Sequence, residues 1–296
     1  MPRTKDLPPT VLDELRRNLE RLKLRAMLAT LDEAMDQAAT LQQGYASFLA
    51  GLVQKEVLAH TDAGAARRIR DAGFPATKTF DTFDWNFQPT LNIQLVKDLM
   101  TLDFVRQARP VLLLGRPGTG KTHLGIAYGH LAALAGYQVR FFAVSKLLTT
   151  LYAALADNTV DRWVRRLSRI DLLLLDDLRP VPPRPEYASL LFEVVDARHG
   201  KKATLVSSNL SVNAWGKVLG NPSLTGSLVD RLMERAHVIN IRRGRSYRSD
   251  GPEAPPEGDR PAGLTCDADD AADSVASPGP AKPEGPGSPT QRGAAS

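Results

Sequence analysis

The chain has 296 residues, 43% of them hydrophobic, and a formal net charge of +5, which is enough for one large or two small domains with a substantial core. No apolar run approaches the roughly 20 residues of a membrane span, and the first residues lack the apolar segment of a signal peptide. The single cysteine, Cys266, excludes a disulfide or a cysteine-based zinc site within the chain. We therefore expect a cytoplasmic protein that does not contact a membrane.

The charge is unevenly distributed along the chain. Residues 249–296 hold nine acidic and three basic side chains, so the preceding body holds 35 basic and 24 acidic ones, a balance of +11. A basic body is typical of proteins that bind a polyanion, most often nucleic acid, although charge alone leaves a chance excess equally open. Residues 249–296 are rich in proline, glycine, serine, alanine and aspartate, and this composition predicts a disordered acidic tail.

Residues 1–72 are predicted to form a small helical domain. Leucines recur at helical spacing from Leu12 to Leu31, a second helix is expected over Tyr45–His60, and a short third helix follows it. Arginines gather on the opposite faces, including Arg67, Arg68 and Arg70 in the third helix. A solvated helix face and a surface for DNA phosphates both remain open for them.

Residues 73–92 are predicted to be an aromatic linker, because prolines stand at both ends and no helical or strand period is present. Its aromatic side chains are Phe80, Phe83, Trp85 and Phe87. They could stack on bases, but we favour the interpretation that they anchor the linker against a core or wall an adenine pocket. Apolar residues at helical spacing from Ile93 to Val105 then predict one helix.

The stretch that follows matches a phosphate-binding loop in the setting that the motif requires. Val111–Leu114 are predicted to form a buried strand, the pattern G-x-x-x-x-G-K-[ST] runs from Gly115 to Thr122, and a helical period continues after it. The glycines let successive backbone N–H groups point inward as an anion nest, and the helix adds its positive end. Lys121 is expected to reach the β- and γ-phosphates of ATP, and the Thr122 hydroxyl to ligate Mg²⁺. The residues expected to bind ATP are Gly115, Arg116, Pro117, Gly118, Thr119, Gly120, Lys121, Thr122 and His123.

Two carboxylates end the next buried strand, which is predicted over residues 170–177. Four leucines in a row are typical of a parallel strand covered on both faces, and such a strand delivers its last residues to the edge where ligands bind. Asp176 is expected to hold Mg²⁺, and Asp177 to orient and deprotonate the attacking water. One such Asp would often be a simple acidic turn, but a pair downstream of a complete phosphate loop favours the metal site.

Further strands are predicted at 138–144, 203–209 and 237–241. Five strands alternating with helices predict an α/β fold over residues 93–248, a doubly wound parallel five-stranded P-loop sheet. Asn209 ends the strand predicted at 203–209, where its amide can bond the γ-phosphate or the water, although a plain Asn turn is the alternative.

This set of residues lacks a cation to offset charge as the γ-phosphoryl group leaves. An arginine from a neighbouring subunit is one known solution, and Arg231 in Val229–Leu232 is the best candidate. A structural salt bridge is the alternative role for Arg231.

Four of these stretches together resemble the AAA+ ATPases of the IstB/DnaC group. They are Gly115–Leu124, Leu172–Leu178, Val206–Asn209 and Val229–Leu232. Within that group, the arginine-bearing N-terminal helices, Phe80–Trp85 and the Asp-Asp pair are most similar to the IstB-like transposition helpers. The resemblance covers roughly residues 7–248.

The resemblance implies an ATPase that assembles as a homo-oligomer on double-stranded DNA and assists a partner transposase. It also implies that Arg231 acts on the ATP of a neighbouring subunit. A replicative helicase loader like DnaC is the alternative function, and a regulator that binds ATP but scarcely hydrolyses it is a third. Asp177 departs from the longer Glu common in AAA+ proteins, which predicts slow hydrolysis.

Overall fold

This computed structural model describes residues 9–179, 184–215, 221–241 and 246–247. The predicted tail at 249–296 and Arg248 lie outside the described residues. Three helices come first, namely α1 (Pro9–Arg21), α2 (Arg25–Thr40) and α3 (Tyr45–Ala72). Within the described ranges, no helix combines the length and apolar character needed to cross a bilayer.

The prediction of two helices between Tyr45 and Ala72 is wrong, because α3 is continuous over all 28 residues. Gly64 lies in its interior, and one glycine costs a helix only about 1 kcal/mol relative to alanine. The Thr61 hydroxyl donates to the Val57 carbonyl at 2.8 Å, so this polar side chain is satisfied within the helix. The alanines around Gly64 favour the helix and outweigh the local break that the sequence indicated.

The first three helices share a small core of their own. Leu19, Met27, Leu31 and Leu52 are buried together. Glu56 is only 6% exposed, and its Oε2 accepts a hydrogen bond from the Met27 backbone N–H at 2.8 Å. A carboxylate on α3 thus caps the first turn of α2, where N–H groups lack partners within their own helix.

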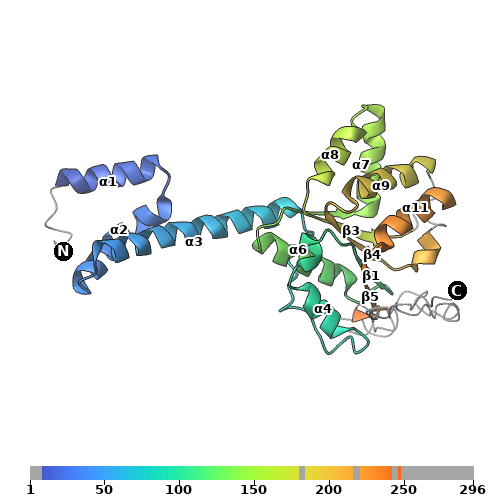
Figure 1. Cartoon of the computed structure of the whole chain (residues 1–296), viewed down its shortest axis with the longest axis horizontal. Coiled ribbons are helices and arrows are strands. Elements are labelled where there is room, and N and C mark those ends of the chain that lie inside the picture. The colour runs from blue at the N-terminus through green and yellow to red at the C-terminus, as the bar shows by residue number, and fades with distance from the viewer. Residues whose placement is uncertain (1–8, 180–183, 216–220, 242–245, 248–296) are drawn as a thin grey trace, which may run out of the picture. The chain divides into compact units, whose positions relative to one another are not determined.

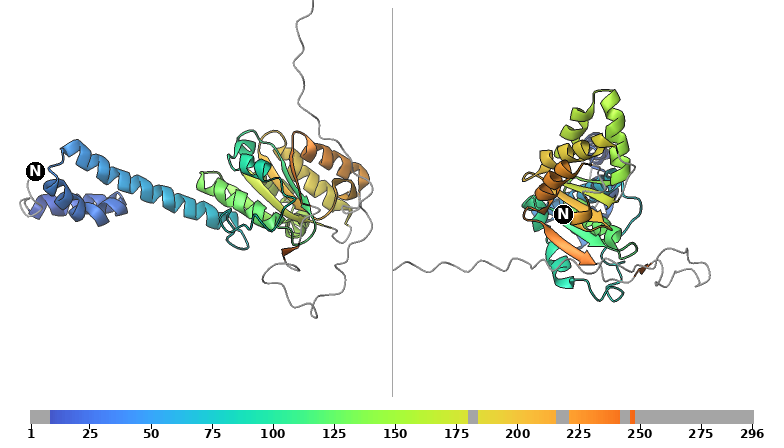
Figure 2. Two further views of the ribbon diagram at one scale, coloured as in Figure 1. Left: turned by 90° about the horizontal axis from the view of Figure 1, so that it is seen from below. Right: turned by 90° about the vertical axis from the view of Figure 1, so that its right-hand side faces the viewer.

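The rest of the described chain forms the predicted fold, a five-stranded parallel sheet with helices on both faces (Figures 1 and 2). The strands are β1 (Val111–Gly115), β2 (Val139–Ala143), β3 (Leu172–Leu178), β4 (Ala203–Ser208) and β5 (His237–Ile241), in the spatial order β2-β3-β4-β1-β5. All four pairings are parallel, so the carboxyl ends of the strands share one edge.

Alternate side chains of the strands enter two separate cores. Leu113 of β1 packs with α4 (Ile93–Leu99), α5 (Asp103–Arg106) and α6 (Lys121–Leu134). Leu112 and Leu114 pack on the other face, whose helices are α7 (Val144–Ala156), α8 (Val160–Ser168), α9 (Pro185–Arg198) and α11 (Pro222–Met233). A short 3₁₀ turn, η2 (Val212–Ala214), follows β4. Burial on both faces explains the uninterrupted apolar runs of β1 and β3.

The single helix expected between Ile93 and Val105 is divided into α4 and α5. Leu102 adopts a left-handed conformation with φ of 61°, which no α-helix can continue through. Its side chain is nonetheless 4% exposed. Leu102 is therefore buried although the helix is interrupted at this residue, and the apolar spacing alone does not distinguish this arrangement from one continuous helix.

Arg198, at the end of α9, is fully buried. Its guanidinium donates to the carbonyls of Leu167, Ile170 and Ala203 and to the Thr204 hydroxyl. Burial lowers the pKa of Arg198 to about 9, so the group is still charged at neutral pH. One side chain thus joins the end of α8 to the starts of β3 and β4.

Replacing Arg198 by alanine should lower the free energy of unfolding by about 3 kcal/mol or more, because three buried carbonyls lose their donor. Urea denaturation measures this change. Arg67→Ala is the control, since Arg67 is 77% exposed in its ion pair with Asp71 and should change stability by less than about 0.5 kcal/mol. Equal effects of the two substitutions would contradict the structural role of Arg198.

Candidate functional site

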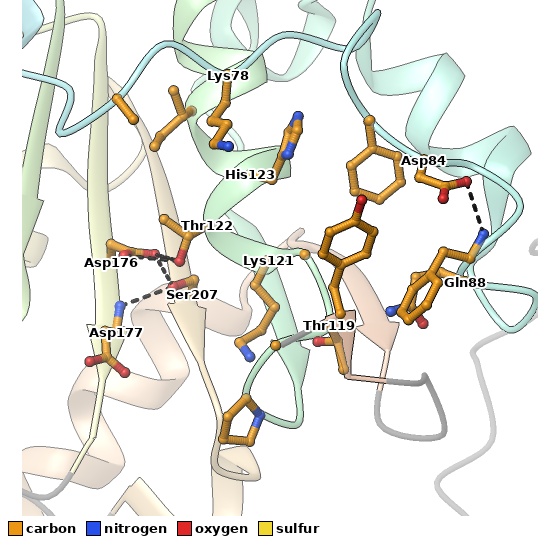
Figure 3. A pocket seen from close by; sticks show the side chains of 18 of the residues that line it. Lys78, Asp84, Gln88, Thr119, Lys121, Thr122, His123, Asp176, Asp177 and Ser207 are labelled. Atoms are coloured by element: carbon orange, nitrogen blue, oxygen red, sulfur yellow. Dashed lines mark hydrogen bonds between the residues drawn. The ribbon is translucent and has the colours of Figure 1, made fainter. Parts of the chain in front are cut away.

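A pocket of about 580 Å³ opens where β1, β3 and β4 end (Figure 3). The phosphate loop forms one wall, from Pro117 to His123, and Asp176, Asp177, Ser207 and Asn209 form another. The structure therefore brings together most of the residues expected to bind ATP and Mg²⁺. Gly115 and Arg116, which were also expected to bind ATP, do not line the pocket, and the Arg116 side chain is exposed.

The loop has the backbone geometry of an anion nest. Gly118 and Gly120 have φ angles of +81° and +91°, a region that side-chain-bearing residues rarely enter. Lys121 begins α6 and is only 8% exposed. Its Nζ donates to the carbonyls of Gly115 and Arg116, both at 2.7 Å. This ammonium group is thereby held across the loop, at the positive end of α6.

Three side chains from three different segments meet beside the loop, as Figure 3 shows. The Thr122 hydroxyl donates to both carboxylate oxygens of Asp176, at 2.9 and 3.1 Å. Ser207 of β4 donates to the same carboxylate at 2.5 Å. Hydroxyl and carboxylate oxygens are the hard ligands that Mg²⁺ prefers, so this donor set fits the expected metal ion. Sequence reasoning missed Ser207, whose only local mark is a polar residue at the end of an apolar strand.

Asp177 faces a different environment from Asp176, although the two are adjacent. The pairing of β3 with β4 is irregular between Leu175 and Leu178, and Asp177 is left-handed there, with φ of 60°. Its backbone N–H donates to the Ser207 hydroxyl at 2.9 Å, while its carboxylate pairs with Arg179 at 3.0 Å. Such a conformation costs about 1–3 kcal/mol and occurs preferentially at functional sites.

His123 attaches the aromatic linker to the phosphate loop. Its Nε2 donates to the Thr79 carbonyl at 2.8 Å and lies 3.3 Å from the Thr82 hydroxyl. Its ring meets that of Phe83 edge to face, with centroids 5.2 Å apart. Phe83 is buried and packs so closely on Gly120 that a Cβ there would lie 2.9 Å from its ring. Phe83 packs in the core, as the interpretation that these aromatic residues anchor the linker predicts, and it also lines the pocket. A role in binding adenine stays a prediction.

A segment near residue 247 also lies against the loop, which the sequence did not predict. The Tyr247 backbone N–H donates to the Gly118 carbonyl at 2.9 Å, and Tyr247 lines the pocket. Its ring meets that of Phe87 edge to face at 4.9 Å. The pocket is therefore walled by residues more than 150 positions apart in the chain.

The two remaining predicted residues lie in different places. Asn209 lines the pocket together with Asp177. Arg231 is not among the residues that line it, and its Nε donates to Asp196 of α9 at 3.0 Å. The salt bridge that the sequence left open as the alternative for Arg231 is thus present within one chain.

A nest of loop N–H groups, a buried lysine at a helix N-terminus and a carboxylate held by a threonine hydroxyl define a P-loop nucleotide-binding protein. The model of the family of IstB-like ATP binding proteins matches residues 17–252. The chain belongs to this family of ATP-binding proteins.

Relatives agree with this assignment. The chain is 35% identical over 237 residues to a protein of Pseudomonas aeruginosa named as an ATP-binding protein of insertion sequence IS21, covering 80% of this chain and 89% of that protein. It is 34% identical to a protein of Mycobacterium tuberculosis named as an ATP-binding protein in an insertion sequence, covering 79% of this chain and 93% of the relative. Among solved structures, the DnaC helicase loader aligns with a TM-score of 0.46 at 17% identity, covering 59% of this chain and 99% of that chain.

The contacts of His123 predict a loss of stability in acid. Burial, and then the nearby charge of Lys78, lower the pKa of His123 below 6.5. The folded state therefore resists a proton that the unfolded chain binds, and the stability is fully present above pH 6.5 and lost as the pH falls through the folded pKa. Urea denaturation at pH 7.5 and 5.5 measures how much the free energy of unfolding falls in acid. This fall should be smaller in His123→Gln than in wild type. Because burial also lowers the pKa of His237, which is unchanged in both proteins, its contribution cancels in the comparison. An equal fall in the free energy of unfolding of both proteins would contradict the lowered pKa of His123.

Proposed function

We propose that this protein is an ATPase that binds duplex DNA in its ATP-bound form, assembles there as a homo-oligomer and assists a partner transposase. The contact of Thr122 with Asp176, beside Lys121 at the head of α6, is the observation that carries the ATPase part. The names of the relatives, which place them in insertion sequences, support the transposition part.

Each residue of the pocket has a distinct task in this proposal. Lys121 exchanges its two loop carbonyls for the β- and γ-phosphate oxygens, and the loop N–H groups bind the same phosphates. Thr122 and Asp176 would hold Mg²⁺, which offsets phosphate charge when bound. Asp177 and Asn209 face the same pocket, where the carboxylate accepts a proton from the attacking water and the amide orients that water.

Hydrolysis is proposed to be slow. Asp177 is one methylene shorter than Glu, and Arg179 holds its carboxylate at 3.0 Å. The shorter side chain and the ion pair both keep this carboxylate away from the attacking water. Slow hydrolysis would give a long-lived ATP-bound assembly on DNA.

Two variants separate ATP binding from hydrolysis. Lys121→Ala should lose ATP-dependent binding to duplex DNA, because the phosphates lose their cation, whereas Asp177→Ala should retain binding and lower the hydrolysis rate by about 10²-fold or more. Duplex and single-strand binding are measured with ATP, with ADP and without nucleotide, alongside phosphate release. A preference for single strands would favour the helicase loader. Tight ATP binding with equally little hydrolysis in wild type and Asp177→Ala would favour the regulator.

Arg231 is proposed to act on the ATP of a neighbouring subunit. It does not line the pocket of its own chain, and its side chain is 44% exposed on α11, so it is accessible to a second copy. A guanidinium group in that position stabilises the charge that develops on the γ-phosphoryl group.

Arg231→Ala alone should hydrolyse ATP about 10³-fold more slowly, and mixing it with Lys121→Ala should restore part of the activity. In the mixture, a Lys121→Ala subunit supplies Arg231 to an intact pocket. Asp196→Ala is the matched control, since it breaks the same ion pair but leaves the guanidinium in place. A defect in Asp196→Ala equal to that of Arg231→Ala, or no recovery on mixing, would contradict action on a neighbour.

A further inference from the structure

A second hollow lies at the edge of the sheet opposite the nucleotide pocket. It has a volume of about 390 Å³ and lies between the start of β2 and the end of α8. Five of its seven lining residues are arginines, namely Arg140, Arg162, Arg165, Arg166 and Arg169. Arg140 stands at the amino-terminal end of β2, whereas the nucleotide pocket lies at the carboxyl ends of the strands.

These arginines are not neutralised by the part of the chain that the structure describes. No salt bridge involves any of the five among the described residues. Asp171 is the nearest acid in sequence to Arg169, but its carboxylate accepts from Lys202 at 2.6 Å and from the Gln138 backbone N–H at 2.8 Å. Asp161 lies in the first turn of α8 and does not line the hollow.

The end of α8 is held firmly against the protein. The buried guanidinium of Arg198 donates to the carbonyls of Leu167 and Ile170, and Leu167 is buried in the core. On the outer side, the guanidinium of Arg166 lies over the Trp163 ring at 5.6 Å from its centroid. The arginines are therefore presented on a rigid support.

Helix stabilisation alone does not account for this arrangement. A cation in the last turn of a helix is stabilised by about 0.3–1 kcal/mol through the helix dipole. This effect accounts for the positions of Arg165 and Arg166 in the last turn of α8. Arg140 comes from β2, and bringing it to the same hollow adds repulsion that a bound anion would relieve.

The spacing along α8 matches a polymeric anion. Arg165 and Arg166 each lie three or four positions from both Arg162 and Arg169, so the four side chains lie on one side of α8 and its C-cap. All four are exposed to solvent. The row spans about 10 Å at 1.5 Å per residue. One strand of a duplex carries a phosphate about every 3.4 Å along the axis, so the row covers about three phosphates.

We infer that the arginine hollow of α8 and β2 binds the phosphate backbone of duplex DNA. The inference rests on the proposed function, and it assigns to duplex DNA a surface separate from the nucleotide pocket. Arg165 and Arg169 contact phosphates, while Arg166 stacked on Trp163 directs its remaining donors outward.

The test compares duplex binding by the full chain in ATP across a salt series. Each phosphate contact contributes about 0.9 to the slope of log K against log salt, so Arg165→Ala/Arg169→Ala should lower that slope by about 2. Lys97→Ala/Lys201→Ala is the control, because it removes the same charge from two exposed sites elsewhere and should leave the slope within about 0.5 of wild type. Arg165→Lys/Arg169→Lys keeps both charges and should recover most of the slope.

The outcomes separate this inference from the proposed function. A wild-type chain that binds no duplex overturns both. If wild type binds duplex but the salt slope of Arg165→Ala/Arg169→Ala is unchanged, the arginine site alone is overturned. The same holds if the salt slope of the lysine control falls as much as that of the arginine variant. ATP hydrolysis without DNA should be the same in wild type and the arginine variant, because the hollow lies at the other edge of the sheet.

Discussion

The parallel pairing of β3, β4 and β1 is the constraint on which the nucleotide site depends. Leu114 of β1 lies level with Ser208 of β4, and Leu175 of β3 lies level with Val206. This register places the phosphate loop, the two carboxylates of β3 and the Ser207 hydroxyl at one edge. The hydrogen bonds that Asp176 accepts from Thr122 and Ser207 then join the end of β3 to the start of α6 and the end of β4. Without a shared register these polar groups could not meet.

The irregularity at the end of β3 separates two carboxylates that are adjacent in sequence. In a regular strand, successive side chains point to opposite faces of the sheet. The left-handed backbone at Asp177 instead keeps both residues at the pocket. The Asp176 carboxylate accepts hydrogen bonds from the Thr122 and Ser207 hydroxyls, and the Asp177 carboxylate forms an ion pair with Arg179. One extra residue in the strand thus allows the proposed metal ligand and the proposed proton acceptor to occupy neighbouring positions.

Buried polar contacts hold both edges of the sheet in place. Lys121 spans the loop at the carboxyl edge, and Arg198 binds three carbonyls toward the amino edge. Each is a cation with neutral carbonyl partners, so each depends on several hydrogen bonds to offset its lost hydration. Arg198 thereby positions the helix that carries the arginine hollow, and Lys121 fixes the loop proposed to bind phosphates.

The sequence alone was sufficient to predict the sheet, the phosphate loop and the Asp176 position, because these depend on residues close together in the chain. Apolar runs predicted the strands, and the glycine pattern predicted the loop from Gly115 to Thr122. Only the tertiary structure revealed the roles of Ser207, Tyr247 and Arg198, the bulge at Asp177 and the pairing of Arg231 with Asp196. Each of these depends on contacts between residues far apart in sequence, and no local period or motif encodes such contacts. The continuity of α3 was missed for a related reason, since one glycine weakens a helix by less than the surrounding residues and packing stabilise it.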